Sequence, residues 1–248
     1  IYSGGVQDSN TGSFYGYEVD AWAKKCYWNH AIYVYGGGHA ETYGGIYYAK
    51  EGNNSYGGYC ADNNSWIYSY SSTMYAKDAS SGNYGMSVTN SCTVKTYGGN
   101  YYAENGQNAL GYWCPGDGAK LYAQQSNGWG KNGSTVNYGS LTASSCMSEM
   151  SGGSYRAEGG TNAYAMRCDD TGVCEVDNVN GWAGKATGNN YTYYNSGTAQ
   201  SKVQSAVLEA ECPDGGCGGA VKYGMYHVGG DVKSAYTQYD NGTAGGYK

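Results

Sequence analysis

The chain is poor in the residues that usually build helical cores. Its 248 residues include one Phe, four Leu, four Ile, two Arg and two Pro. Helical proteins need Leu, Glu, Lys and Arg in quantity, whereas this chain has 43 Gly. Each Gly costs about 1 kcal/mol relative to Ala within a helix. The composition therefore excludes a predominantly helical fold.

Charge is also sparse, and it shows no concentrated cationic patch. Only 14% of the residues are charged, and the formal net charge is −6. The lysines are scattered singly apart from Lys24 and Lys25, whereas nucleic-acid binding normally requires a basic surface. No apolar run approaches the roughly 18 residues that a membrane-spanning helix needs. We therefore expect neither a nucleic-acid partner nor a membrane span.

The aromatic residues oppose a disordered chain. There are 31 Tyr and 6 Trp, whereas disordered chains usually lack aromatics and carry high net charge. Tyr, Trp, Val and Thr suit the pleated surface of a strand, and Gly, Asn, Asp and Ser suit the turns between strands. The sequence thus predicts an all-β fold with a core of Tyr, Trp, Val and Ala.

A tandem repeat is the strongest signal in the sequence. The segment 44–49 (GGIYYA) recurs as 98–103 (GGNYYA) and 152–157 (GGSYRA). The period is about 54 residues, a length close to those of solenoid and propeller units. We expect a partial repeat over 1–43, full repeats over 44–97, 98–151 and 152–205, and a shortened or partial repeat over 206–248.

Two architectures fit such units. Each unit contains several short stretches of strand propensity, such as 66–70 (WIYSY). We predict three or four strands per unit, arranged either as stacked β units or as a five-bladed propeller. A helical pattern over 202–211 competes with the repeat there, and we prefer the repeat. The predicted fold class is therefore all-β, built from tandem repeats and stabilised by disulfides.

The nine cysteines indicate an oxidising compartment, because disulfides compensate for a thin apolar core. Pairing within units predicts Cys60–Cys92, Cys114–Cys146, Cys168–Cys174 and Cys212–Cys217, and leaves Cys26 unpaired or bonded to another molecule. A competing scheme joins Cys26–Cys60, Cys92–Cys114, Cys146–Cys168 and Cys212–Cys217, and leaves Cys174 over. We favour the first scheme and expect an extracellular, secreted protein.

Glycosylation signals agree with secretion. The pattern N-x-[S/T] occurs five times in Gly/Asn-rich stretches that suggest surface turns. The candidate acceptors are Asn53, Asn63, Asn132, Asn190 and Asn241.

Residues that could support catalysis are few and scattered. His39 and Glu41, with His30 nearby, could supply an acid and a base, but a His beside three glycines is more often a solvated polar residue. Glu51, Glu104 and Glu158 recur near one repeat position, whereas an enzyme normally has one pair of catalytic carboxylates. We therefore expect no enzyme, no catalytic residues and no cofactor.

One acidic segment could in principle bind calcium. Asp169, Asp170, Glu175 and Asp177 precede Asn178, Asn180 and Gly181, but their spacing does not match an EF-hand loop. Paired cysteines of the zinc-binding type C-x-x-C are absent from the sequence. We expect a solvated acidic turn and no metal site.

A series of aromatic residues, each followed closely by a lysine, recurs with the repeat. We expect Trp22, Tyr75, Trp129 and Trp182 to anchor the core of each unit, because few other large apolar residues are available. The alternative is that they are exposed and stack against sugars.

Two functions fit these features. The first is an extracellular structural protein that assembles with copies of itself into a filament, appendage or matrix. The alternative is a multivalent lectin with one weak, aromatic-lined glycan site per repeat, whose sites combine through avidity.

Overall fold

Short runs of Tyr, Val, Thr and Ala separated by Gly, Asn and Ser form strands throughout the chain. The structure is a computed structural model that describes residues 2–9, 12–211, 221–235 and 238–240. Every regular element in these residues is a β-strand, and the predicted strand over 66–70 is confirmed as β8 (Trp66–Tyr70). The helical pattern over 202–211 instead forms two strands.

The strands form three parallel sheets of nine strands each. Sheet A contains, in spatial order, β1 (Tyr2–Ser9), β4 (Trp28–Tyr35), β7 (Asn54–Cys60), β10 (Gly82–Val88), β13 (Asn108–Cys114), β16 (Val136–Thr142), β19 (Asn162–Cys168), β22 (Asn189–Ser196) and β25 (Val221–Val228). Sheet B contains β2 (Ser13–Tyr17), β5 (His39–Tyr43), β8 (Trp66–Tyr70), β11 (Thr93–Tyr97), β14 (Lys120–Gln124), β17 (Met147–Ser151), β20 (Val173–Asp177), β23 (Gln200–Gln204) and β26 (Asp231–Ala235). Sheet C contains β3 (Ala21–Lys24), β6 (Ile46–Lys50), β9 (Thr73–Lys77), β12 (Asn100–Glu104), β15 (Asn127–Lys131), β18 (Ser154–Glu158), β21 (Asn180–Gly184), β24 (Val207–Ala210) and β27 (Gln238–Asp240).

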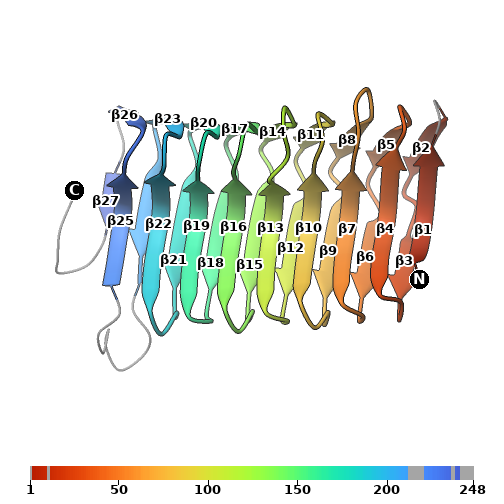
Figure 1. Cartoon of the computed structure of the whole chain (residues 1–248), viewed down its shortest axis with the longest axis horizontal. Helices are drawn as coiled ribbons and strands as arrows, with labels where there is room; N and C mark the ends of the chain where they lie inside the picture. Colours follow the sequence, from red (N-terminus) through yellow and green to blue (C-terminus); the bar gives the residue numbers. More distant parts are fainter. Residues whose placement is uncertain (1, 10–11, 212–220, 236–237, 241–248) are drawn as a thin grey trace.

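Each circuit of the chain contributes one strand to every sheet, so the circuits stack as the coils of a parallel β-solenoid (Figure 1). Gly82 pairs with Asn54 of the coil before and with Asn108 of the coil after. The structural unit is therefore one coil of three strands, and the predicted repeat spans two coils. The stacked architecture is the one present, and the chain does not form a propeller.

Neighbouring coils differ at the corner between sheets B and C. One type of corner is Gly-Gly, in which both residues have positive φ, as at Gly44 (69°) and Gly45 (79°). A Cβ on Gly45 would lie 2.2 Å from the carbonyl oxygen of Val19 in the coil before, so only Gly fits there. In the next coil Ser72 takes the place of the second Gly, and its hydroxyl donates to the Gly44 carbonyl at 2.9 Å. The recurrent Gly-Gly motif is thus one of two alternating corners.

A second alternation occurs where sheet C leads into sheet A. Asn83 and Asn137 are completely buried near the start of their strands. Asn137 accepts a hydrogen bond from the Gly133 amide at 2.8 Å and donates to the Gly159 carbonyl at 2.8 Å. The coil between them has Ala109 in register at this position. The buried amide therefore fixes the corner of its own coil and that of the next coil.

The interior is narrow and filled by alternate residues of the strands. Tyr47, Tyr101, Tyr112, Tyr155 and Tyr193 are its largest completely buried side chains. Met, Ala, Val and Cys fill the space between these rings. Tyr, Val and Ala are thus core residues as predicted, but the predicted tryptophans are not among the buried core residues.

Three disulfides lie in the described part of the chain, and they are those of the within-unit scheme. Cys60–Cys92 and Cys114–Cys146 each span 32 residues and tie the end of a sheet A strand to the following coil. Cys168–Cys174 closes a short loop within one coil. Cys26 is half-buried and makes no disulfide with the described residues. The predicted pair Cys212–Cys217 lies outside them.

The outer face of sheet A is covered by stacked rings. Tyr164 stacks on Tyr138 and on Tyr191 with ring centroids 5.2 Å apart in both pairs. His30 occupies the same row and packs against Tyr56 at 4.9 Å, so only 4% of its surface is exposed. This burial lowers the pKa of His30 from 6.5 to about 4, because the charged imidazolium is poorly solvated there.

Candidate functional site

The predicted aromatic residues meet in one row on the outer face of sheet C. Strand pairing places side chains of successive coils in register through this sheet. The middle outward position of each strand forms what we call the aromatic row: Trp22, Tyr48, Tyr75, Tyr102, Trp129, Arg156 and Trp182. Glu209 on β24 follows Trp182.

The expectation that these aromatics anchor the core is wrong. Trp22 is 61% exposed, and none of the other rings in the row is buried. The reason is the two-residue period of a strand, which sends neighbouring side chains to opposite faces. Tyr47, Met74 and Tyr101 fill the interior beside the row, and so the next residue of each strand must face outward.

The rings of the row differ in orientation. Trp22 meets Tyr48 edge-to-face at 5.1 Å, and Tyr102 meets Trp129 edge-to-face at 5.6 Å. Tyr48 and Tyr75 are stacked at 5.2 Å. An edge-to-face pair leaves one ring with its face turned away from its partner. The rings of the row therefore do not form one uniform stack.

Amide and hydroxyl side chains lie on one side of the aromatic row. Asn127 donates a hydrogen bond to Asn100 at 3.0 Å and accepts one from the Ser154 backbone amide at 2.9 Å. Thr73 and Asn180 hold the same position on their strands. We call these residues, Thr73, Asn100, Asn127, Ser154 and Asn180, the polar row.

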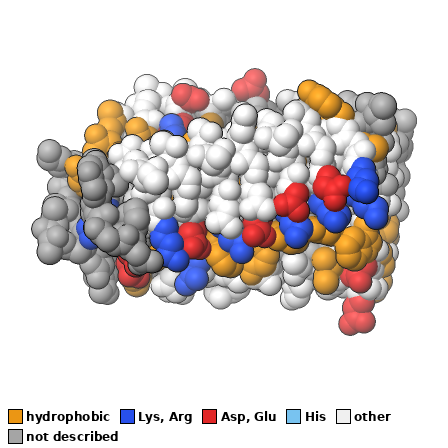
Figure 2. Space-filling view, turned by 90° about the horizontal axis from the view of Figure 1, so that it is seen from below, with side chains coloured by type: hydrophobic (Ala, Val, Ile, Leu, Met, Phe, Trp, Pro, Cys, Tyr) orange, Lys and Arg blue, Asp and Glu red, His pale blue; other side chains and the backbone are white. Residues whose placement is uncertain are grey.

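A charged row lies on the other side of the aromatic row, and Figure 2 shows cationic and anionic side chains close together along the molecule. Its members are Lys24, Lys50, Lys77, Glu104, Lys131 and Glu158. Lys131 pairs with Glu104 at 3.5 Å. Glu158 pairs with Lys185 of the adjacent corner at 3.0 Å. The recurrent glutamates thus form ion pairs rather than a carboxylate pair.

The two rows are in contact with each other. The Nζ of Lys131 lies 4.7 Å from the centroid of the Trp129 ring. Tyr75 donates its hydroxyl hydrogen bond to Glu104. Burial and this bond raise the pKa of the Tyr75 hydroxyl above its ordinary range. The rings are therefore held in place by polar groups of the surface itself.

A shallow depression lies in the middle of the aromatic row. Tyr102, Asn127, Trp129, Ser154 and Arg156 surround a volume of about 240 Å³. The indole N–H of Trp129 has no acceptor among the described residues. A buried donor without an acceptor costs about 1–3 kcal/mol.

No model of a protein family, no curated protein and no solved structure matches this chain. The described residues contain no helix long and apolar enough to cross a membrane.

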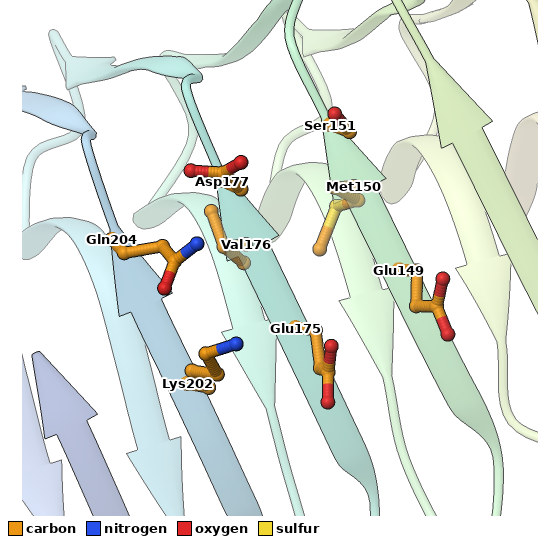
Figure 3. Close-up of a pocket in the computed structure, with 8 residues that line it drawn as sticks. All are labelled: Glu149, Met150, Ser151, Glu175, Val176, Asp177, Lys202 and Gln204. Atoms are coloured by element: carbon orange, nitrogen blue, oxygen red, sulfur yellow. The ribbon is translucent and has the colours of Figure 1, made fainter.

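A second depression, of about 180 Å³, lies on sheet B (Figure 3). Glu149 and Glu175 point outward from neighbouring strands, in register, and Lys202 follows on the next strand. The described residues contain no group of three His, Cys, Asp or Glu side chains that could hold a metal ion. This depression lacks exposed rings. Another depression on the same sheet, of about 320 Å³, is lined by the rings of Trp66, Tyr68 and Tyr122.

The acidic segment considered for calcium is divided between several elements. Asp169 lies in a loop and pairs with Arg167 at 2.6 Å, whereas Glu175 and Asp177 lie on β20 and face outward. Asn178 turns the corner, and Asn180 and Gly181 belong to β21 on sheet C. These oxygen atoms do not converge on one point.

The histidines considered for catalysis are also separated. His39 lies on β5 and stacks on Trp66 at 4.4 Å. Glu41 accepts a hydrogen bond from Tyr43 at 2.5 Å. His30 lies on sheet A among tyrosines. The structure does not bring His30 to the other two residues.

The candidate glycosylation acceptors have different environments. Asn63 and Asn132 are exposed in turns, and Asn53 is half-buried in a corner. Asn190 is completely buried and accepts a hydrogen bond from the Ala186 amide at 3.1 Å, so its side chain is inaccessible in the folded chain. Asn241 lies outside the described residues.

Proposed function

We propose that the chain binds a polysaccharide that lies along the solenoid axis on the outer face of sheet C. The observation that carries this proposal is the single outward row that contains Trp22, Tyr75, Trp129 and Trp182, with further aromatic residues between them. Disulfides between coils are compatible with an extracellular setting for such binding.

The chemistry of the three rows suits a sugar chain. Aromatic rings pack against the C–H faces of sugar rings, while polar groups at their edges bond hydroxyls. Strands of a sheet lie about 4.8 Å apart, so the row presents a contact at every coil. Each contact is weak, and a polymer that engages several of them gains affinity through effective concentration.

Trp129→Ala is expected to weaken polysaccharide binding at least tenfold, because it removes the ring at the centre of the row and of the depression. Aromatic anchors of this kind dominate binding energies, and a tenfold loss corresponds to about 1.4 kcal/mol. Affinity electrophoresis through gels that contain single soluble polysaccharides would measure the change. Trp66→Ala on sheet B is the matched control and should bind as the wild type does.

The proposal fails in either of two cases. One is a wild-type chain that migrates unretarded through every neutral and acidic polysaccharide gel. The other is a retarded wild type that Trp129→Ala and Trp66→Ala affect equally, since binding would then not depend on sheet C.

Self-assembly into a filament is a second candidate, which the open sheet edges favour. Among the described strands, β1, β2 and β3 each pair on one side only. Unpaired parallel edges are templates for strands of another molecule. A second copy of the chain stacked along the axis would extend all three sheets.

Negative-stain electron microscopy of the purified chain tests this second candidate. Filaments whose axial repeat equals one solenoid length are expected if copies stack end to end. Dispersed particles at high protein concentration, with polysaccharide binding intact, would leave only the first function.

A further inference from the structure

We infer that the bound polysaccharide is acidic, and that Arg156 recognises a carboxylate or sulfate group on it. This inference rests on the proposed function and names its ligand class. The starting point is the position of Arg156. From β3 to β21, all the strands of sheet C except β18 have a Trp or Tyr at this position of the row.

The guanidinium of Arg156 is exposed and uncommitted. It takes part in none of the ion pairs, side-chain hydrogen bonds or cation–π contacts found among the described residues. The other arginine, Arg167, is held by Asp169 at 2.6 Å and lies over the Tyr164 ring at 4.9 Å. The two arginines thus have different roles, and only Arg156 offers its donors to a ligand.

The acidic groups nearest to Arg156 in the charged row are already paired. Glu158, on the same strand, bonds Lys185 at 3.0 Å, and Glu104 pairs with Lys131 at 3.5 Å. Each of these carboxylates already has a cationic partner, so neither needs Arg156 as one. The guanidinium therefore remains available in the depression that it shares with Tyr102 and Trp129.

The charge of this face also favours an anionic ligand. The charged row, its adjoining corner and the outward residues Arg156, Glu209 and Glu211 contain seven cations and six anions, although the chain has a net charge of −6. The cations are Lys24, Lys25, Lys50, Lys77, Lys131, Arg156 and Lys185, and the anions are Glu51, Asp78, Glu104, Glu158, Glu209 and Glu211. A local excess of one sign attracts the opposite charge over about 8–10 Å at physiological salt.

Arginine is suited to this task because its planar fork binds a carboxylate or sulfate through two parallel hydrogen bonds. Trp129 and Trp182 occupy the strands on either side of Arg156. A sugar ring that stacks on one of these tryptophans places a charged substituent beside the guanidinium. The row thus combines stacking sites with one anion site.

The test compares each acidic polymer with the same backbone after its charge is removed. The comparison of polygalacturonate with its methyl ester tests recognition of carboxylates. The comparison of carrageenan with desulfated carrageenan tests recognition of sulfates. We expect the wild type to bind at least one acidic polymer at least tenfold more tightly than its neutral counterpart at about 0.15 M salt. Whichever pair shows this difference identifies the anion.

Variants assign the preference to Arg156. Arg156→Gln should reduce the acidic-to-neutral ratio to near one while the affinity for the neutral polymer is retained. Arg156→Lys should recover part of the ratio, because it keeps the charge but not the paired donors. Lys202→Gln removes a cation from sheet B and should leave the ratio unchanged. Circular dichroism confirms that all variants are folded.

The outcomes separate this inference from the function on which it rests. Equal binding of charged and neutral polymers, or an unchanged ratio in Arg156→Gln, overturns the inference that the ligand is acidic. If Trp129→Ala still abolishes binding in that case, the proposal of polysaccharide binding stands. Absence of binding to all four polymers and to neutral glucans overturns both.

Discussion

Removal of both long-range disulfides is expected to lower the free energy of unfolding by about 6–8 kcal/mol. Cys60–Cys92 and Cys114–Cys146 each close a loop of 32 residues. On the chain-entropy model, a loop of this length contributes about 3–4 kcal/mol by restricting the unfolded chain. The two bridges are separate and their contributions should add. Replacement of all four cysteines by Ala, followed by urea denaturation, measures the loss.

The solenoid makes this loss especially large relative to its total stability. The core is narrow and contains few large aliphatic side chains, and folded domains are stable by only about 5–15 kcal/mol. Cys26→Ala is the matched control, since Cys26 makes no disulfide with the described residues, and it should change the free energy of unfolding little. An equal denaturation midpoint for the wild type and the four-cysteine variant would contradict the stabilising role of the bridges.

Acidification from pH 7 to pH 4 should destabilise the chain through His30. The buried, neutral imidazole has its pKa lowered from 6.5 to about 4. The unfolded chain therefore binds a proton between these values that the folded chain does not bind. The stability contributed by the neutral form is complete above pH 6.5 and is lost as the pH falls toward 4. At about 1.4 kcal/mol per pKa unit, the loss is about 3 kcal/mol.

The variant His30→Phe isolates this contribution from other acid effects. Phe fits a row of rings that already contains Tyr56 and Tyr84. Between pH 7 and pH 4, this variant should lose about 3 kcal/mol less stability than the wild type does. His39→Phe, at a partly exposed site on sheet B, should lose as much as the wild type. Parallel pH profiles for the wild type and His30→Phe would show that His30 is not the responsible group.

Much of the fold was predictable because its signals are local. Strand propensity and Gly-rich turns predict an all-β chain. The spacing of 32 residues favoured Cys60–Cys92 and Cys114–Cys146, and the loss of that spacing in the next unit favoured Cys168–Cys174. The choice between stacked units and a propeller was not predictable, because it depends on which strands pair. The prediction of three or four strands in each 54-residue repeat was wrong for a related reason, because that length spans two coils and six strands. Two successive coils have different corners, Gly44-Gly45 and Ser71-Ser72, so the similarity of single coils is hidden in the sequence.

The candidate site was predictable in its members but not in its orientation. The sequence identifies Trp22, Tyr75, Trp129 and Trp182 as equivalent, yet periodicity alone does not say which face of a strand is buried. Each of these rings is followed at two or three residues by Lys24, Lys77, Lys131 or Lys185. A lysine two residues away shares the face of the ring, and this was the available signal that the rings point outward. Arg156 could not be found this way, because its proposed role depends on the aromatic residues that strand pairing places on either side of it.

The alternation of corners limits how such a chain can change its length. The buried Asn137 side chain donates a hydrogen bond to the Gly159 carbonyl and so stabilises the corner of the coil that follows, which has Ala163 in register with Asn137. Duplication or loss of one coil would place two coils of the same kind side by side and mismatch their corners. Duplication or loss of an adjacent pair preserves every contact across the junction. Genetic lengthening or shortening of this solenoid should therefore proceed by even numbers of coils, and the aromatic row would gain or lose two positions at each step.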